Sequence, residues 1–130
     1  MTNLEIYKSA LAVLAESMTD GDNDDYEERA PYLLAAFCTD ACDIDARLRR
    51  ALDEPPGDVI NAVYVPLEND FPLLDRFSSA ATLYLAAMLI IDDYPEASDR
   101  LYDKYIDAMS AICSSAPATC ESIHNRYFYD

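Results

Sequence analysis

Glycine and tryptophan are nearly missing from this chain, whose 130 residues include two glycines and no tryptophan. Glycine supplies the positive-φ positions of tight hairpin turns and of phosphate-binding loops. Its scarcity therefore argues against a turn-rich β fold and against a glycine-rich nucleotide site. Histidine occurs once, as His124, which leaves little material for a nucleophile activated by a neighbouring base. We expect no enzyme activity.

Basic residues are also scarce, with nine Lys and Arg against 25 Asp and Glu, for a net charge of −16. Such a surface repels nucleic-acid phosphates and anionic membranes, so we expect no direct nucleic-acid binding. It attracts basic proteins or cations, or it simply keeps the chain in solution. Composition alone leaves these alternatives open.

The chain has no long apolar run and no leader-like start. The longest apolar stretch, residues 80–91, is shorter than the roughly 20 residues that a membrane span needs. The first residues lack the basic and apolar regions of a secretory signal. Four cysteines are too few for a disulfide scaffold of this length. We therefore expect a cytoplasmic protein with no membrane association.

Hydrophobic residues make up 52% of the chain and recur at helical spacing in four segments. The predicted helices cover about residues 3–18, 25–52, 72–91 and 95–113, and a tail follows over 114–130. The sequence thus predicts an all-α, single-domain bundle over residues 1–130. Residues 80–91 are apolar nearly all round, which is typical of a central helix.

Finer signals set the expected helix ends. Pro31 interrupts the second segment, and we favour a short turn followed by a main helix from Pro31. Asp70 and Asp93 are the expected caps of the third and fourth helices. Asp45 and Arg49 form one expected i,i+4 pair.

The segment from about 55 to 70 is expected to be irregular or to hold a short extended stretch. Residues 59–65 (VINAVYV) are rich in β-branched and aromatic side chains. Because no second strand is evident in the chain, this stretch would pair with another subunit or lie as an ordered loop over the core.

Two groups of residues suggest metal sites but fail on spacing. Asp20, Asp22 and Asp24 match alternate positions of a calcium loop, yet Asp25 replaces its glycine and Pro31 its bidentate glutamate. The cysteines and histidine match no zinc spacing, and Cys38 at the edge of an apolar stripe fits a core position. We predict no metal and no cofactor, while the roles of the thiols stay open: Cys38, Cys42, Cys113 and Cys120.

A third candidate metal site comes from Glu96 and Asp99, which match the ExxD of helical magnesium-dependent pyrophosphatases. The ExxE that should precede it is missing, so the pair is interpreted as the start of a helix. The aromatic end of the chain is the least ordinary feature. Tyr127, Phe128 and Tyr129 either fold back over the end of the bundle or dock on a partner.

Four blocks form a gapped pattern: residues 64–67 (YVPL), 70–77 (DFPLLDRF), 80–87 (AATLYLAA) and 96–105 (EASDRLYDKY). This pattern resembles the small helical head–tail connector (adaptor) proteins of tailed bacteriophages and prophages. The likeness extends from residue 64 to residue 112 and includes no catalytic motif. The strongly acidic charge and the cysteines of the second helix are not part of it.

The resemblance implies a virion structural protein without a cofactor. Copies would form a ring beneath the portal and contact portal or tail proteins, in the cytoplasm and then in the virion. Extended segments of such adaptors often pair with neighbouring proteins, which implies docking through Val63, Tyr64 and Val65 or through Tyr127, Phe128 and Tyr129. Two alternatives stay open: a small acidic inhibitor or nucleic-acid mimic that binds a basic partner, and a metal-dependent hydrolase.

Overall fold

The computed structural model describes residues 1–17, 24–57 and 60–116. Within these ranges the chain forms α1 (Asn3–Ser17), α2 (Asp24–Ala51), α3 (Ser78–Leu89) and α4 (Pro95–Ser115), and a 3-10 helix, η1 (Asp75–Phe77), directly before α3. The same ranges contain no strand, only an isolated antiparallel bridge between Thr2 and Asp70. The predicted all-α fold with four main helices is confirmed.

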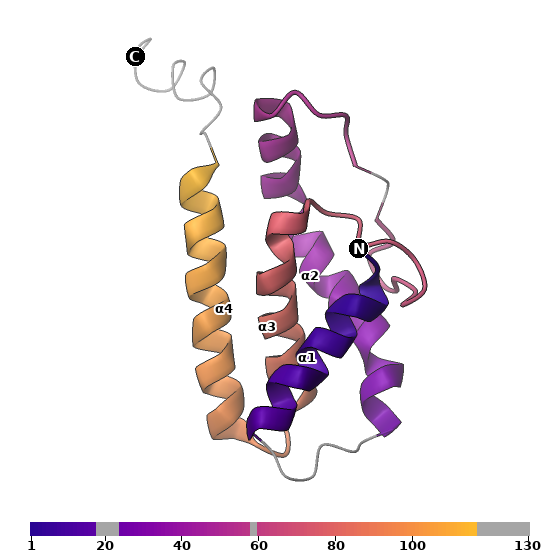
Figure 1. Ribbon diagram of the computed structural model, residues 1–130, viewed down its shortest axis with the longest axis vertical. Helices are drawn as coiled ribbons and strands as arrows, with labels where there is room; N and C mark the ends of the chain where they lie inside the picture. Colours follow the sequence, from indigo (N-terminus) through magenta and orange to yellow (C-terminus); the bar gives the residue numbers. More distant parts are fainter. Residues whose placement is uncertain (18–23, 58–59, 117–130) are drawn as a thin grey trace.

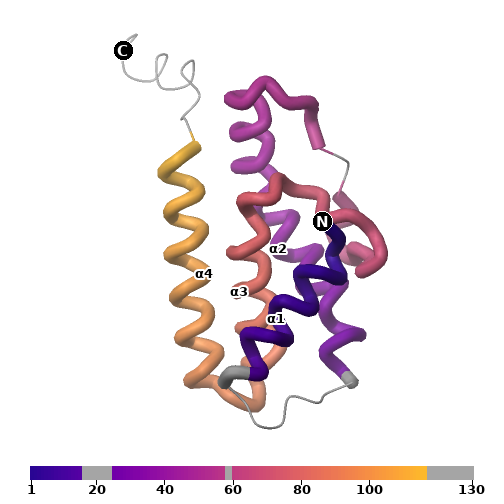
Figure 2. The backbone as a smooth tube through the Cα atoms, viewed as in Figure 1, coloured from indigo at the N-terminus to yellow at the C-terminus, as the bar shows by residue number. Residues whose placement is uncertain are grey.

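Helix α3 is the centre of the molecule, as the sequence predicts. It lies beside α4 and also contacts α1 and α2 (Figures 1 and 2). Leu85 is completely buried, and four alanines of this helix are buried with it: Ala80, Ala81, Ala86 and Ala87. Because alanine has a short side chain, the neighbouring helices can approach α3 closely. The core therefore surrounds a narrow helix.

Helix α2 is continuous through Pro31, so the favoured interpretation of a main helix beginning at Pro31 is wrong. A proline inside a helix removes one backbone hydrogen bond and usually destabilises it. Here Tyr26 and Ala30, which precede the proline, are buried in the core and hold the first two turns in place. Tertiary packing outweighs the local penalty.

The third helix is shorter than predicted. Residues 71–74 form an irregular segment, η1 follows, and α3 begins only at Ser78. Asp70 caps no helix, because it lies in the bridge with Thr2. Pro72 disfavours a helical conformation at Phe71, which explains the late start. Phe71 and Leu73 are nevertheless buried and belong to the core.

The outer helices begin in different ways. At α1, the Thr2 backbone N–H donates to Glu5 Oε1 (2.9 Å) and the Glu5 N–H donates to Thr2 Oγ1 (3.2 Å), which is the reciprocal capping arrangement. The Glu5 carboxylate accepts hydrogen bonds from the Thr2 backbone N–H and from Thr2 Oγ1 (3.3 Å), and these two bonds lower the pKa of Glu5. At α4, Pro95 occupies the first turn as predicted, but the cap is Tyr94 instead of Asp93 and makes no side-chain cap bond.

One buried hydroxyl links the two packed helices of the second half. Ser98 is buried, and its Oγ donates a hydrogen bond of 2.8 Å to the Ala87 carbonyl oxygen. Because this carbonyl lies in the last turn of α3, it has no partner along its own helix. The bond therefore satisfies a helix end and fixes the position of α4 along α3.

Candidate docking surface

The connection between α2 and η1 is a long loop whose second half is fixed to the rest of the fold. The Val65 N–H donates to the Pro31 carbonyl oxygen (3.2 Å). Hydrogen bonds to the first residues of α1 follow: Leu4 N–H to Leu67 O (2.8 Å), Asn3 N–H to Asn69 O (2.9 Å) and Phe71 N–H to Met1 O (2.8 Å). The described part of residues 59–65 forms no strand, so it is an ordered loop over the core.

A side chain within this loop shapes an exposed turn. Asn61 Oδ1 accepts hydrogen bonds from the backbone N–H groups of Val63 (2.9 Å) and Tyr64 (3.2 Å). Asparagine often stabilises turns by bonding to the backbone two residues further along. The turn leaves 65% of Val63 and 40% of Tyr64 exposed.

Tyr32 of α2 extends this exposed surface. Its ring meets the Tyr64 ring edge to face, with centroids 5.0 Å apart and an interplanar angle of 69°, and 54% of Tyr32 is exposed. We call Tyr32, Val63 and Tyr64 the tyrosine patch. Tyr32 was missed from the sequence, although an aromatic residue next to Pro31 and off the apolar stripe of α2 was a usable signal.

The predicted docking residues do not all lie on this surface. Val65 is buried, and it anchors the loop while Val63 and Tyr64 face outward. Tyr127, Phe128 and Tyr129 lie outside the described residues. The available part of the predicted surface is therefore Val63 and Tyr64, to which the structure adds Tyr32.

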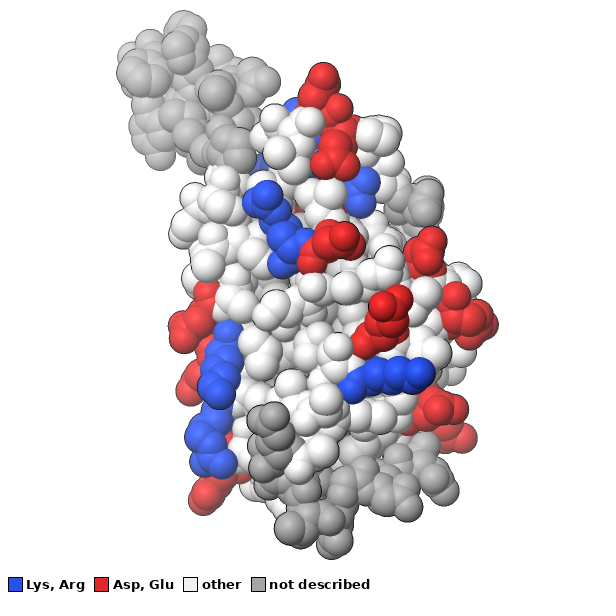
Figure 3. Space-filling view, viewed as in Figure 1, with Lys and Arg blue, Asp and Glu red and all other residues white. Residues whose placement is uncertain are grey.

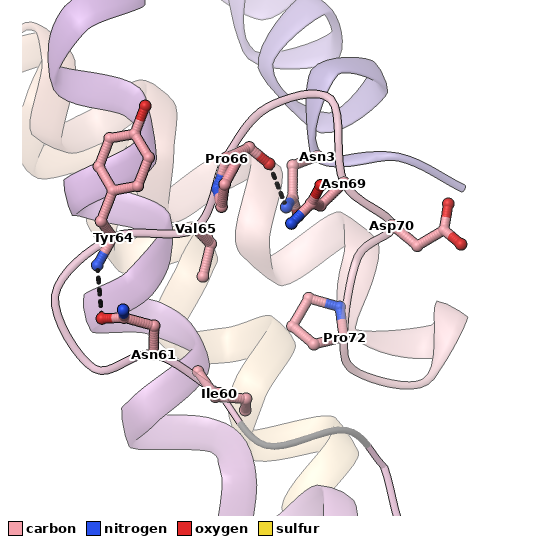
Figure 4. Close-up of a pocket in the computed structure, with 9 residues that line it drawn as sticks. All are labelled: Asn3, Ile60, Asn61, Tyr64, Val65, Pro66, Asn69, Asp70 and Pro72. Carbon is pink, nitrogen blue, oxygen red and sulfur yellow. Dashed lines mark hydrogen bonds between the residues drawn. The ribbon is translucent and has the colours of Figure 1, made fainter.

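A pocket of about 310 Å³ lies beside the patch, between the loop and the start of α1 (Figure 4). Asn3 is buried in its wall, where Nδ2 donates to the Pro66 carbonyl oxygen (2.9 Å). The lining mixes amide, carboxylate and apolar groups: Asn3, Ile60, Asn61, Tyr64, Val65, Pro66, Asn69, Asp70 and Pro72. The volume is near the lower end for small-ligand sites, and it suits a single inserted side chain.

Both ends of the loop are held by the predicted Asp45–Arg49 pair, which is confirmed with Nε 2.8 Å from Oδ2. Asp45 is buried, and its other oxygen, Oδ1, accepts from the Leu74 N–H at 2.8 Å. Arg49 also donates to the carbonyl oxygens of Pro55 and Pro72, each at 3.3 Å. The sequence predicted the pair but not that it binds the loop to α2.

The cysteines have different surroundings. Cys38 is buried, and burial, with smaller contributions from Asp45 and Cys42, raises the pKa of its thiol to about 12. Cys42 is half-buried and donates to the Thr39 carbonyl oxygen (3.2 Å), whereas Cys113 is exposed on α4. A thiol like that of Cys38 stays protonated and unreactive at neutral pH.

Across residues 1–17, 24–57 and 60–116, no group of His, Cys, Asp and Glu side chains is arranged to hold a metal ion. Glu96 and Asp99 are exposed in the first turns of α4. The remaining metal candidates, Asp20, Asp22, Cys120 and His124, lie outside the described residues, and Asp24 begins α2.

Within the described ranges, no helix has the length and apolar character required to cross a membrane. The described residues form a small all-α bundle in which hydrogen bonds fix residues 65–71 to α2 and to the start of α1. Comparison of the chain with protein-family models, with curated proteins and with solved structures finds no match.

Proposed function

We propose that this chain is a non-enzymatic protein that docks on other protein subunits, in the manner of a phage head–tail connector. The tyrosine patch carries this proposal. Tyrosine is enriched at protein interfaces, where its ring supplies contact area and its hydroxyl a hydrogen bond. In this chain two tyrosine rings and a valine are exposed together on a surface built from α2 and the loop.

The way the patch is held supports docking. The turn is fixed by Asn61, and the loop is fixed through Val65 and the start of α1. A surface that is already ordered loses less conformational entropy when a partner binds. The exposed rings would therefore act as anchors, and the adjacent pocket would receive a side chain of the partner.

The resemblance of residues 64–112 to head–tail connectors gives the proposal its specific form. Tyr64 of the tyrosine patch is the first residue of this stretch, in the block YVPL. Copies of the chain would assemble into a ring and bind portal or tail proteins, in the cytoplasm during assembly and afterwards in the virion. A strongly acidic wall suits a ring through which DNA must pass, because it does not bind the phosphate backbone.

The experiment is mass spectrometry of density-purified particles from the source organism after prophage induction. The chain should appear at a stoichiometry close to that of the portal protein. If particles form without it, the connector proposal is wrong.

A variant tests the patch itself. The double variant Tyr32→Ser, Tyr64→Ser should keep a normal melting temperature but be lost from particles. Tyr94→Ser is the matched control, because Tyr94 is also partly exposed but lies at the start of α4. If particles retained the double variant at the wild-type level, the tyrosine patch would not be the docking site.

A further inference from the structure

A second apolar surface lies on α4, on different elements from the tyrosine patch. Tyr102, Ile106, Met109 and Cys113 are spaced by four, three and four residues, which places them in one row along the helix. Tyr102 is 38% and Ile106 43% exposed, Cys113 is exposed and Met109 is partly buried. We call this row the α4 stripe. The described residues leave more than a third of Tyr102 and of Ile106 exposed.

The stripe begins from a rigid aromatic cluster. The Tyr102 ring packs against Tyr105 (centroids 5.2 Å apart), and Tyr105 packs edge-on against Tyr84 of α3 (5.1 Å). Phe37 of α2, which is fully buried, contacts both Tyr84 and Tyr105. These four rings form a continuous chain of contacts from the core to the surface. Tyr102 is therefore supported from beneath and offers a fixed contact surface.

The outer flank of the stripe is acidic. Asp99, Asp103 and Asp107 are exposed and follow one another at four-residue spacing, so they form a parallel row on the outer flank. Asp40 of α2 contributes to the raised pKa of Tyr105, which reaches about 12 chiefly through burial and then through Tyr102. A partner on the stripe meets a row of carboxylates along its outer flank.

The basic residues of this helix lie elsewhere. Arg100 and Lys104 are exposed at positions that follow the acidic row around α4, on the side away from the stripe. Both charge signs are visible where α4 forms the edge of the face shown in Figure 3. Arg100 and Lys104 precede Asp103 and Asp107 by three residues, so they lie next to the acidic row on its far side and leave the side that faces the stripe for a cationic partner.

We propose that the α4 stripe binds an amphipathic helix of a partner protein whose apolar face is flanked by lysine or arginine. The apolar side chains would cover Tyr102 and Ile106, and the cationic side chains would meet Asp99, Asp103 and Asp107. Helix-in-groove and helix-on-helix recognition use this combination of anchors and charges. The proposal does not depend on the connector function, because it rests on different residues.

A second copy of the chain is a poorer occupant because of charge. In an antiparallel pair of α4 helices, the rows of Asp99, Asp103 and Asp107 from the two copies would face each other. Like charges placed opposite each other oppose association, so the stripe favours a basic partner over itself.

The test uses the full chain and a synthetic peptide of about 18 residues, long enough to span the stripe as a helix. The peptide carries leucines at i, i+3, i+4, i+7 spacing and lysines on both flanks. Fluorescence anisotropy gives its Kd at two salt concentrations, and NMR shifts locate the site. We expect shifts centred on Tyr102 and Ile106 and weaker binding at high salt. A peptide of the same composition with scrambled order should bind at least about tenfold more weakly.

Matched charge variants separate a built surface from general acidity. Asp99→Asn, Asp103→Asn, Asp107→Asn should raise the Kd by about tenfold or more. The control Glu28→Gln, Glu54→Gln, Glu68→Gln makes the same change in net charge at exposed positions off α4 and should alter the Kd by less than about twofold. Equal effects of the two triple variants would overturn the proposal.

A variant of the apolar row tests the stripe directly, and two further measurements distinguish the other segments that could cover it. Ile106→Gln should weaken binding of the peptide without changing the melting temperature of the protein. A concentration-dependent dimer of the wild type that Ile106→Gln abolishes would assign the stripe to a second copy. Absence of peptide binding, with NMR contacts from residues 117–130 to Ile106, would assign it to the chain's own C-terminal segment. Either result overturns the proposal and leaves the particle experiment on the tyrosine patch unaffected.

Discussion

Replacing Asp45 by alanine should separate the long loop from the end of α2. Asp45 lies in the second half of α2, and its two oxygens serve two partners: Oδ2 pairs with Arg49 and Oδ1 accepts from the Leu74 N–H. Arg49 in turn donates to the carbonyl oxygens of Pro55 and Pro72. One carboxylate thus supports contacts to both ends of the loop.

The expected loss of unfolding free energy in Asp45→Ala follows from the two groups that lose a partner, the Leu74 N–H and the Arg49 side chain. A partly buried N–H left unpaired costs about 1–2 kcal/mol, as expected for the Leu74 amide. The Arg49 side chain is only 15% exposed, but it keeps its hydrogen bonds to the Pro55 and Pro72 carbonyl oxygens, so loss of the ion pair adds about 1 kcal/mol. Asp45→Ala should therefore lower the free energy of unfolding by about 2–3 kcal/mol. Asp45→Asn keeps an acceptor for Leu74 and should lose about half as much.

Urea unfolding followed by circular dichroism measures these values, and hydrogen exchange at the Leu74 amide reports the loop directly. Asp43→Ala is the matched control, because Asp43 is exposed on the same helix and gains the same helix propensity; its effect should stay within about 0.5 kcal/mol. If Asp45→Ala were no more destabilising than Asp43→Ala, the pair would not hold the loop.

Three further results are expected. Leu85→Asp should cost several kcal/mol, because it places an unpaired charge in the completely buried centre of α3; an unchanged melting temperature would contradict the central position of that helix. The pKa of Tyr105 is raised from 10.0 to about 12, so its contribution to stability is present below pH 10 and is lost as the pH rises towards 12; Tyr105→Phe should flatten the stability curve in this window. At pH 8, iodoacetamide should alkylate Cys113 much faster than Cys38 in the folded chain, and similar rates would contradict the burial of Cys38.

Periodic features of the sequence predicted most of the fold. The apolar run around Leu85 identified the central helix, and helical spacing predicted the helix over about 95–113, whose Leu101 and Tyr105 are buried. The Asp45–Arg49 pair was also predictable, since both residues lie on one helix. Local spacing contains this information.

Errors arose where distant segments decide the outcome. Pro31 is a strong local helix breaker, and only the burial of Tyr26 and Ala30 keeps α2 continuous. Asp70 looks like a helix cap from its neighbours, yet it lies in a bridge with Thr2. Tyr32 joined the candidate site only through its contact with Tyr64, which no spacing along the chain predicts.

The hydrogen bonds between the start of α1 and residues 66–71 affect how the protein fluctuates. Asn3 and Pro66 are 63 positions apart, so this contact closes a large loop and carries an entropy cost that the local α3–α4 pairing does not. We therefore expect the N-terminal turn to join the fold late and to open before the core. Because the same bonds hold the loop that presents Tyr64, a partner bound to the tyrosine patch should slow exchange of the Asn3, Leu4 and Phe71 amides. Binding of a partner to the tyrosine patch and closure of the N-terminal turn would then be thermodynamically linked.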